Sequence, residues 1–276
     1  SLTLSNTVLV RANGTRNVRM RATDLEGIYT FSLDDIDEAR GLRWGTYQAG
    51  VAKELAQAGF RLTGLDMLWD STLPFGSGLS SSASIELAAG IAFASMAENG
   101  LKSFAPEDKI ALAVAGQRAE NRFCGVNCGI MDQFASAMGL SEHAVMLDCA
   151  TLEYEYVPLE PGKYSLVLAN TRKKHALGAS KYNERRAEVA RGLEMMHQAL
   201  PEKQLPELCG YTPSDFEAAR SFMANDPVIS ARVEHGVLSV ELPKQVQEKV
   251  KTAIENMTGI IVEEVDIRIA TVSVGK

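Results

Sequence analysis

The sequence predicts a mixed α+β fold on three observations. The chain has 276 residues, 46% hydrophobic and 23% charged, which is typical of a globular protein with a sizeable core. Short runs of alternating apolar residues predict strands, and longer runs with apolar residues three and four positions apart predict helices. Because strands and helices do not alternate regularly along the chain, a strictly parallel sheet is not favoured.

The first half of the chain is predicted to begin with strands within residues 1–34. They are joined by turns such as Asn13-Gly14, a pair that favours tight hairpins. A helix follows over 44–58, where Gly59 supplies a usual helix end. We then expect a strand over 65–69 and a helix over 85–96. Pro106, with two acidic residues behind it, predicts the start of a helix that runs to about Phe123.

The second half is predicted to add a short helix over 131–138, strands over 144–148 and 164–169, and helices over 182–200 and 213–223. The last 40 residues differ in character. A strand-like run at 237–242 precedes an amphipathic helix over 243–257, and β-branched residues then alternate along 260–274. We therefore expect a small β-α-β unit after a boundary near Gly236.

Charge and cysteine content exclude several classes of protein. The net charge of −7 argues against broad binding of nucleic acid or anionic membranes. No run of 18 apolar residues and no signal peptide is visible, so neither a membrane span nor secretion is expected. Cys124 and Cys128 have the spacing of a metal pair, but no second Cys/His pair follows at a suitable distance. The four cysteines therefore indicate reduced thiols in a cytoplasmic protein.

The most informative stretch is 74–83, Pro-Phe-Gly-Ser-Gly-Leu-Ser-Ser-Ser-Ala, between the strand at 65–69 and the helix at 85–96. Glycines let the backbone approach a bulky anion, and the free N–H groups and dipole at a helix start favour phosphate. Serine hydroxyls add donors and a possible magnesium ligand. The alternative interpretation is an ordinary glycine- and serine-rich turn with a serine cap.

Two acidic residues lie near helix ends downstream of this loop. Asp132, at a helix start, is a candidate base for a substrate hydroxyl, or simply an acid stabilised by the helix dipole. Glu120, at a helix end, is a candidate Mg²⁺ ligand, or simply an exposed surface residue. Together with the phosphate loop they are the parts of a phosphoryl transferase. The Walker pattern and the protein-kinase triplets are absent.

Several motifs in the same order resemble one family. The stretch 74–86 resembles the second motif of the GHMP small-molecule kinases. The run 128–134, Cys-Gly-Ile-Met-Asp-Gln-Phe, narrows the resemblance to galactokinases, as do Ala119-Glu120, the run 143–149 and the run 182–186. The similarity covers residues 1–236. It implies an N-terminal part like the second domain of a small-subunit ribosomal protein and a partial, ferredoxin-like C-terminal part.

The resemblance also implies roles for individual residues. ATP would be the co-substrate, and its phosphates would be wrapped by Gly76, Ser77, Gly78, Leu79, Ser80, Ser81 and Ser82. Ser82 and Glu120 would hold Mg²⁺, and Asp132 would face the anomeric hydroxyl of galactose. Gly129 and Tyr182 would contact the sugar, although Tyr182 without the family would be taken for a surface tyrosine. The reaction implied forms galactose-1-phosphate.

The chain also departs from the family pattern. A first motif, an arginine and a Glu-His-Thr-Asp run that grips the sugar, is not found, nor is the glycine-rich third motif. Residues 237–276 instead resemble the alkaline-shock proteins. We therefore expect a truncated galactokinase with an N-terminal domain over 1–160, a partial C-terminal domain over 161–236 and a foreign tail over 237–276. The alternatives are an inactive sugar or nucleotide sensor, an N-acetylgalactosamine kinase, and an interaction module, and no protein partner is identified.

Overall fold

The structure is a computed structural model that describes residues 4–74, 78–159 and 179–237. It divides into two compact units, Ser1–Asn183 and Glu184–Lys276. The strand expected over 164–169 and nearly all of the tail expected over 237–276 lie outside the described residues. The domain boundaries expected after 160 and 236 therefore stay predictions. No helix in the described ranges is long and apolar enough to cross a membrane.

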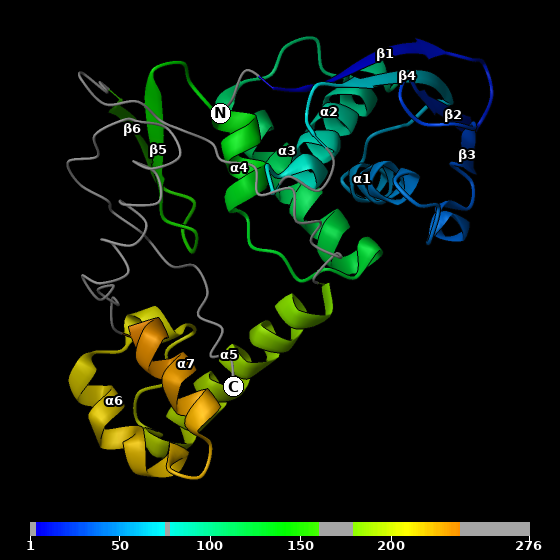
Figure 1. Ribbon diagram of the computed structural model, residues 1–276. Coiled ribbons are helices and arrows are strands. Elements are labelled where there is room, and N and C mark those ends of the chain that lie inside the picture. The colour runs from blue at the N-terminus through cyan, green and yellow to red at the C-terminus, as the bar shows by residue number, and fades with distance from the viewer. Residues whose placement is uncertain (1–3, 75–77, 160–178, 238–276) are drawn as a thin grey trace, which may run out of the picture. The chain divides into compact units, whose positions relative to one another are not determined.

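A four-stranded sheet is built in the first unit from β1 (Asn6–Ala12), β2 (Asn17–Ala22), β3 (Tyr29–Ser32) and β4 (Leu65–Ser71) (Figure 1). The strand order is β1-β4-β2-β3, with β4 antiparallel to β1 and parallel to β2. The strands are confirmed, but the hairpin at Asn13-Gly14 is wrong. The late strand β4 lies between the two strands that this turn connects, so their pairing depends on a distant segment.

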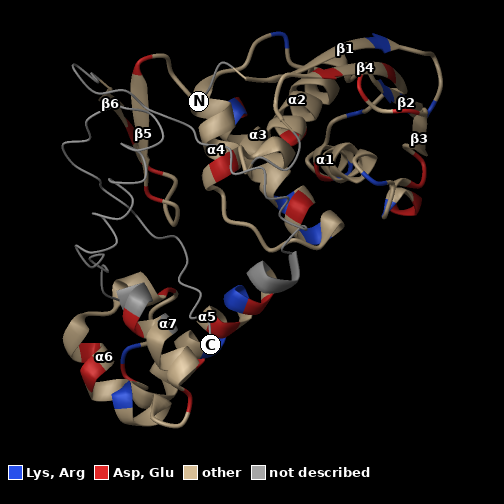
Figure 2. Ribbon diagram, in the orientation of Figure 1, with Lys and Arg blue, Asp and Glu red and all other residues tan. Residues whose placement is uncertain are grey.

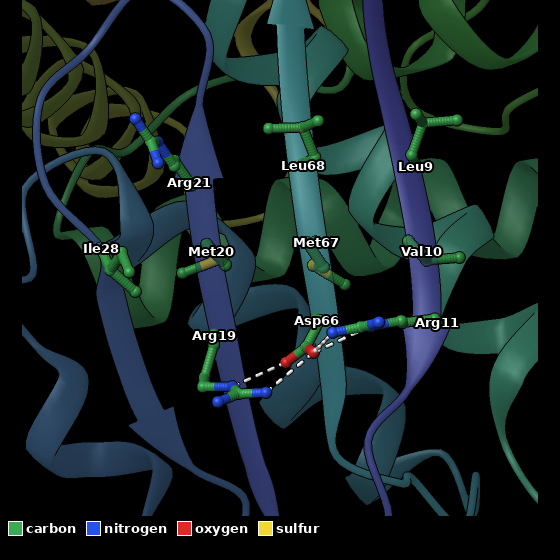
Figure 3. Close-up of a pocket in the computed structure, with 10 residues that line it drawn as sticks. All are labelled: Leu9, Val10, Arg11, Arg19, Met20, Arg21, Ile28, Asp66, Met67 and Leu68. Carbon is green, nitrogen blue, oxygen red and sulfur yellow. Dashed lines mark hydrogen bonds and ion pairs between the residues drawn. The ribbon is translucent and has the colours of Figure 1, made fainter.

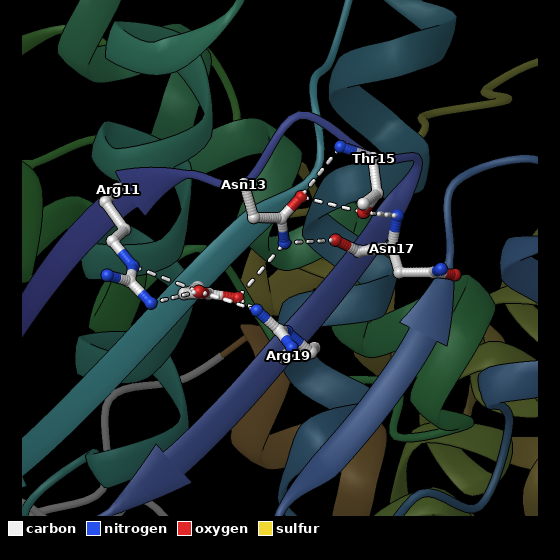
Figure 4. A network of polar contacts seen from close by, with 6 residues as sticks. Arg11, Asn13, Thr15, Asn17 and Arg19 are labelled. Carbon is white, nitrogen blue, oxygen red and sulfur yellow. Dashed lines mark hydrogen bonds and ion pairs between the residues drawn. The ribbon is translucent and has the colours of Figure 1, made fainter.

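The side chain of Asn13 explains the turn without a hairpin. Its Oδ1 accepts hydrogen bonds from the N–H and hydroxyl of Thr15 at 3.0 and 2.7 Å. Its Nδ2 donates to the carbonyl of Asn17 and to Asp66 on β4 (Figure 4). Asparagine commonly replaces backbone partners in turns in this way. The turn therefore directs β2 to the far side of β4.

Helices α1 (Gly45–Gln57) and α2 (Ser81–Met96) pack beside the sheet, and α3 (Pro106–Ala119) and α4 (Met131–Met138) pack against them. A short 3₁₀ turn, η1 (Ile36–Ala39), precedes α1. These four helices are confirmed, but α3 ends at Ala119 and continues as a π turn, η2 (Glu120–Cys124), rather than running to Phe123 as α-helix. The core between helices and sheet includes Met20, Val51, Leu65, Phe93 and Phe123.

The other face of the sheet carries exposed side chains. Leu9 and Ile28 are each 67% exposed, and Leu68 pairs with Leu9 across β1 and β4. With Arg11, Arg19 and Asp66 they line a shallow hollow of about 460 Å³ (Figure 3). Asp66 accepts from Arg11 at 2.9 Å and from Arg19 at 2.7 Å, and these contacts hold its pKa well below its usual range.

A second, two-stranded sheet pairs β5 (His143–Leu147) antiparallel with β6 (Tyr154–Pro158). Strand β5 was expected one residue later, and β6 was not expected. The ring of Tyr154 packs edge-on against Phe134 of α4, with centroids 5.3 Å apart. Phe134, Ile130, Met138 and Ala113 form the buried cluster that holds α4 in place.

The second unit is helical in its described part. It contains most of α5 (Ala179–Ala199), a 3₁₀ turn η3 (Leu208–Gly210), α6 (Pro213–Ala219), η4 (Arg220–Met223) and α7 (Pro227–Val237). Thr212 caps α6 reciprocally with Asp215. The helix expected over 213–223 is thus divided into an α and a 3₁₀ segment, and α7 was not expected. Its core contains Met196, Leu208, Tyr211, Phe216, Ala219, Met223, Ile229 and Val233.

Candidate active site

The glycine- and serine-rich loop joins β4 to α2, and its last residues begin the helix. Gly78 and Ser80 adopt left-handed backbone, with φ of 72° and 54°. Glycine accepts this conformation freely, whereas serine is strained in it. The Ser80 side chain makes no capping hydrogen bond, so the serine cap of the alternative interpretation is not formed and the first N–H groups of α2 are not occupied by it. Gly76 and Ser77 lie outside the described residues.

Glu120 lies where α3 gives way to the π turn, and it is only 7% exposed. The turn is wide because the carbonyl of Glu120 accepts the N–H groups of both Gly125 and Val126. Gly125, with φ of 77°, then ends the turn. Such turns are frequent at functional sites. The exposed surface role that the sequence left open for Glu120 is therefore wrong.

Four side chains from three elements, α2, η2 and α4, meet in a largely buried polar cluster. The hydroxyl of Ser82 lies 3.5 Å from Oε2 of Glu120. Nε2 of Gln133, on α4, donates to Oε2 of Glu86 at 2.9 Å and to Oε2 of Glu120 at 3.0 Å. Glu86 and Gln133 are each 1% exposed. The start of α2 and the end of α3 are thus tied together through α4.

The two carboxyls of this cluster are electrostatically linked. Burial raises the pKa of Glu86 well above its usual range, and the charge of Glu120 raises it further. Burial also raises the pKa of Glu120, opposed by hydrogen bonds from Glu86, Cys128 and Ser82. The interaction between the two carboxyls raises the pKa of Glu86 and opposes the rise in that of Glu120. Of the two, Glu86 therefore has the more strongly raised pKa.

Asp132 occupies the first turn of α4, and its side chain is exposed. Its charge raises the pKa of both Glu86 and Glu120, so it lies within electrostatic range of the cluster. A Cβ added to Gly129 would meet no atom within 4 Å, so the space there is open.

Basic and acidic residues are interspersed along the described elements (Figure 2).

Tyr182 lies in the first turns of α5, but its side chain is outside the described part of the chain. The next residue, Asn183, accepts a hydrogen bond from the N–H of Asn127 at 3.0 Å and donates to the carbonyl of Gly125 at 3.1 Å. The start of α5 is thereby fixed to the loop that precedes Gly129. The contact of Tyr182 with sugar stays a prediction.

The residues expected to hold Mg²⁺ offer the donors that this ion prefers. Ser82 provides a hydroxyl and Glu120 a carboxylate, and Mg²⁺ usually takes one or two protein oxygens together with phosphate oxygens and water. Within the described ranges, no three or more His, Cys, Asp and Glu side chains are grouped to hold a metal by themselves. The donor set therefore fits an ion that arrives with a nucleotide.

Sequence reasoning gave no role to Glu86, Gln133 or Tyr47. Burial, and then the charges of Glu120 and Glu86, raise the pKa of Tyr47 to about 12, so this tyrosine borders the same cluster. A signal was present for Glu86, which lies four residues after Ser82 and so on the same face of α2. Gln133 directly follows Asp132, but its role depends on helices whose packing the sequence does not reveal.

Comparison with known proteins places these features in a family. Residues 46–140 match the GHMP kinases N terminal domain. A galactokinase of Bacillus subtilis is 40% identical over 241 residues, which are 86% of this chain and 59% of that protein. A galactokinase of Clostridium tetani is 38% identical over 236 residues, 86% of this chain and 58% of the relative. The chain thus spans less than two thirds of the length of these relatives.

A solved structure gives the same result for the fold. The structure of Lactococcus lactis galactokinase complexed with galactose superposes with a TM-score of 0.77 at 32% identity. The match covers 93% of this chain and 63% of that one. The fold expected from the motifs at 74–86 and 128–134 is therefore confirmed.

Proposed function

Because this chain belongs to the GHMP kinase family, we propose that it transfers the γ-phosphoryl group of ATP to the anomeric hydroxyl of galactose. The bond from the γ-phosphorus to the bridging oxygen of ADP breaks while a bond to the sugar oxygen forms. The proton of the hydroxyl passes to Asp132. The products are ADP and galactose-1-phosphate.

One observation carries this proposal. The carboxyl of Glu120 is buried at the end of α3, its Oε2 lies 3.5 Å from the hydroxyl of Ser82, and the charge of Asp132 acts on it. A phosphate loop, a metal ligand and a base are thus available to one reaction centre. Phosphoryl transfer depends mainly on positioning and electrostatic stabilisation, so few protein groups are needed.

Each of the candidate site residues has a part in this mechanism. The N–H groups at the start of α2, with the hydroxyls of Ser80, Ser81 and Ser82, bind the phosphates. Ser82 and Glu120 would hold Mg²⁺, which when bound would neutralise charge on the phosphate oxygens. Asp132 orients the sugar hydroxyl and accepts its proton. Its exposure at the start of α4 leaves room for a sugar beside the open space at Gly129.

The names of the relatives favour galactose over the other substrates and roles considered. The matches to galactokinases at 38–40% identity give no support to a sensor or to an N-acetylgalactosamine kinase. The location in the cytoplasm, expected from the low cysteine content of the sequence, is part of the same proposal.

The test uses the full 276-residue chain. MgATP and galactose are titrated separately by calorimetry, and ADP release is then followed with galactose, N-acetylgalactosamine and glucose. Turnover fastest with galactose is the expected result. Faster turnover with N-acetylgalactosamine would overturn the assigned sugar. Binding without turnover would favour a sensor, and no binding of either ligand an interaction module.

A further inference from the structure

A buried amide links the candidate Mg²⁺ ligand to a second carboxyl group. One nitrogen of Gln133 donates to Glu86 at 2.9 Å and to Glu120 at 3.0 Å. The amide carries two hydrogens, one for each carboxyl. Because Gln133 and Glu86 are each 1% exposed, bulk water does not compete for these bonds. The position of each carboxyl is therefore fixed relative to the other.

Packing leaves Glu86 and Gln133 little freedom. A Cβ added to Gly116 would lie 3.2 Å from Oε2 of Glu86 and 3.3 Å from Cγ of Gln133, so the backbone of α3 closes directly over the pair. Gly116 precedes Glu120 by one helical turn, which brings the carboxylate ligand next to the same contact. Glu86 is thus enclosed among helices, and any effect on a ligand must pass through Glu120.

Stability alone does not account for this pair. Oε1 of Glu86 and Oε1 of Gln133 are buried without a hydrogen-bond partner. Buried polar atoms without partners are unfavourable, and apolar residues of similar shape in their place are often neutral or stabilising. A role other than stability therefore explains why α2 and α4 present a carboxyl and an amide here.

We propose that Gln133 and Glu86 are positioning residues that hold the carboxylate of Glu120 in the orientation in which it binds the Mg²⁺ of MgATP. This inference rests on the proposed function. Gln133 fixes Oε2 of Glu120 on the side of Ser82, the other expected ligand. Glu86 shares the amide of Gln133, so one donor holds both carboxyls in a fixed arrangement. Neither residue touches the nucleotide.

The experiment compares nucleotide binding with and without the ion. A fluorescent ATP analogue is titrated in excess Mg²⁺ and in EDTA, and the ratio of the two dissociation constants gives the contribution of Mg²⁺. The variants are Gln133→Met and Glu86→Leu, which remove the polar contacts at similar size, and Glu86→Gln. The matched control is Gln48→Met, since Gln48 is a fully buried glutamine on α1 whose amide has no partner. Urea unfolding is measured for every variant.

Loss of an outer-shell partner typically weakens metal binding about 10- to 100-fold. For Gln133→Met and Glu86→Leu we therefore expect the affinity for the ATP analogue in excess Mg²⁺ to fall by about 10- to 100-fold. Affinity in EDTA should change less than about twofold, although each single substitution leaves a buried polar partner unpaired and so lowers stability. The ratio for Glu86→Gln should remain within about threefold of the wild type, because an amide oxygen of similar size still accepts from Gln133. Gln48→Met should keep the wild-type ratio.

Three results would overturn the inference. If the ratio of the two dissociation constants is unchanged in Gln133→Met and Glu86→Leu, Glu120 binds Mg²⁺ without help from these two residues. Equal losses of nucleotide affinity in Mg²⁺ and in EDTA would assign the pair a structural role. A loss in Glu86→Gln as large as in Glu86→Leu would make Glu86 itself a ligand. A wild type whose nucleotide affinity does not depend on Mg²⁺ would instead overturn the proposed function, and this inference with it.

Discussion

At the scale of single residues, the burial of each carboxyl group sets the role that we propose for it. Asp132 stays exposed on the first turn of α4, whereas Glu120 and Glu86 lie inside. The motifs at 119–120 and 128–134 were sufficient to single out Glu120 and Asp132 for a role. They were not sufficient for Glu86 and Gln133, since the burial of those side chains comes from the packing of α2, α3 and α4 rather than from their own neighbours in sequence.

Substitution of Asp132 tests the proposed base. Asp132→Asn keeps the size of the side chain but cannot accept the hydroxyl proton. General-base contributions are typically 10²- to 10⁴-fold, so we expect turnover with galactose to fall by about 10² or more. The dissociation constant for MgATP should stay within about twofold, because the role proposed for Asp132 is toward the sugar and not the nucleotide. Near-normal turnover would exclude Asp132 as the base.

The raised pKa of Glu86 predicts a dependence of stability on pH. Below its ordinary pKa of 4.5, Glu86 is protonated in both the folded and the unfolded chain. As pH rises, the unfolded chain loses this proton first, so the folded state is weakened by up to about 1.4 kcal/mol per pH unit until Glu86 ionises there too. The amide side chain in the Glu86→Gln variant cannot ionise. The variant's free energy of unfolding relative to the wild type should therefore increase between pH 5 and pH 8.

This prediction is measured by urea unfolding in EDTA at several pH values. Glu120 remains in both proteins, so its own raised pKa largely cancels in the difference. Parallel curves for the wild type and Glu86→Gln would show that burial does not retain the proton on Glu86.

At the scale of elements, helices were predicted well and strand pairing was not. Apolar periodicity within 44–58 and 131–138 contains the information needed for α1 and α4. The pairing of β1 and β2 with β4 depends on residues far along the chain, which no local pattern reports. The π turn after Ala119 was also missed, because it depends on two N–H groups sharing one carbonyl.

The close packing of α1 on α3 can be tested at Gly50. A Cβ there would meet Cβ of Ala119 and Cβ of Phe123 at 3.1 Å, atoms that cannot rotate away. Overpacking of this kind costs about 1–3 kcal/mol, and we expect Gly50→Ala to destabilise unit 1 by that amount. MgATP affinity should also fall, since the displaced segment carries Glu120. Urea unfolding and nucleotide titration measure both effects.

Gly90→Ala is the matched control on α2. Its Cβ would meet only Cδ2 of Leu112 closely, at 3.2 Å, and that methyl group ends a flexible side chain. Replacing glycine by alanine inside a helix gains up to about 1 kcal/mol, so this variant should be neutral or stabilised. Equal losses of stability in the two variants would contradict the explanation that the rigid neighbours of Gly50 cause the destabilisation.

At the scale of the whole molecule, the described chain has separate hydrophobic cores in its two units. The division after Asn183 was not foreseen, because α5 is one uninterrupted helix in sequence as in structure. The amino-acid composition does not change at that point, so only the contacts within each folded unit reveal the division. The fold of the first unit, by contrast, was predictable from motifs spread along it.

The separate cores predict separate unfolding signals. Both tryptophans, Trp44 and Trp69, lie in the first unit, so their fluorescence reports on that unit alone. Phe216 is 1% exposed in the core of the second unit, and Phe216→Ala should cost that core about 3–5 kcal/mol. We expect the helical circular-dichroism signal to be lost earlier on heating while the tryptophan transition keeps its midpoint. An equal shift of both signals would contradict this.

The position of β4 has a consequence for synthesis of the protein. On the ribosome, β1 and β2 emerge before their common partner β4, which begins about forty residues after β2 ends. Strand β2 can pair with β3 early, but at roughly 5–20 residues per second β1 and the other edge of β2 stay unpaired for several seconds. During that interval the apolar residues of β1 are open to chaperones and to neighbouring nascent chains. Slowing translation between codons 23 and 64 should therefore lower the yield of native protein more than slowing it after codon 71.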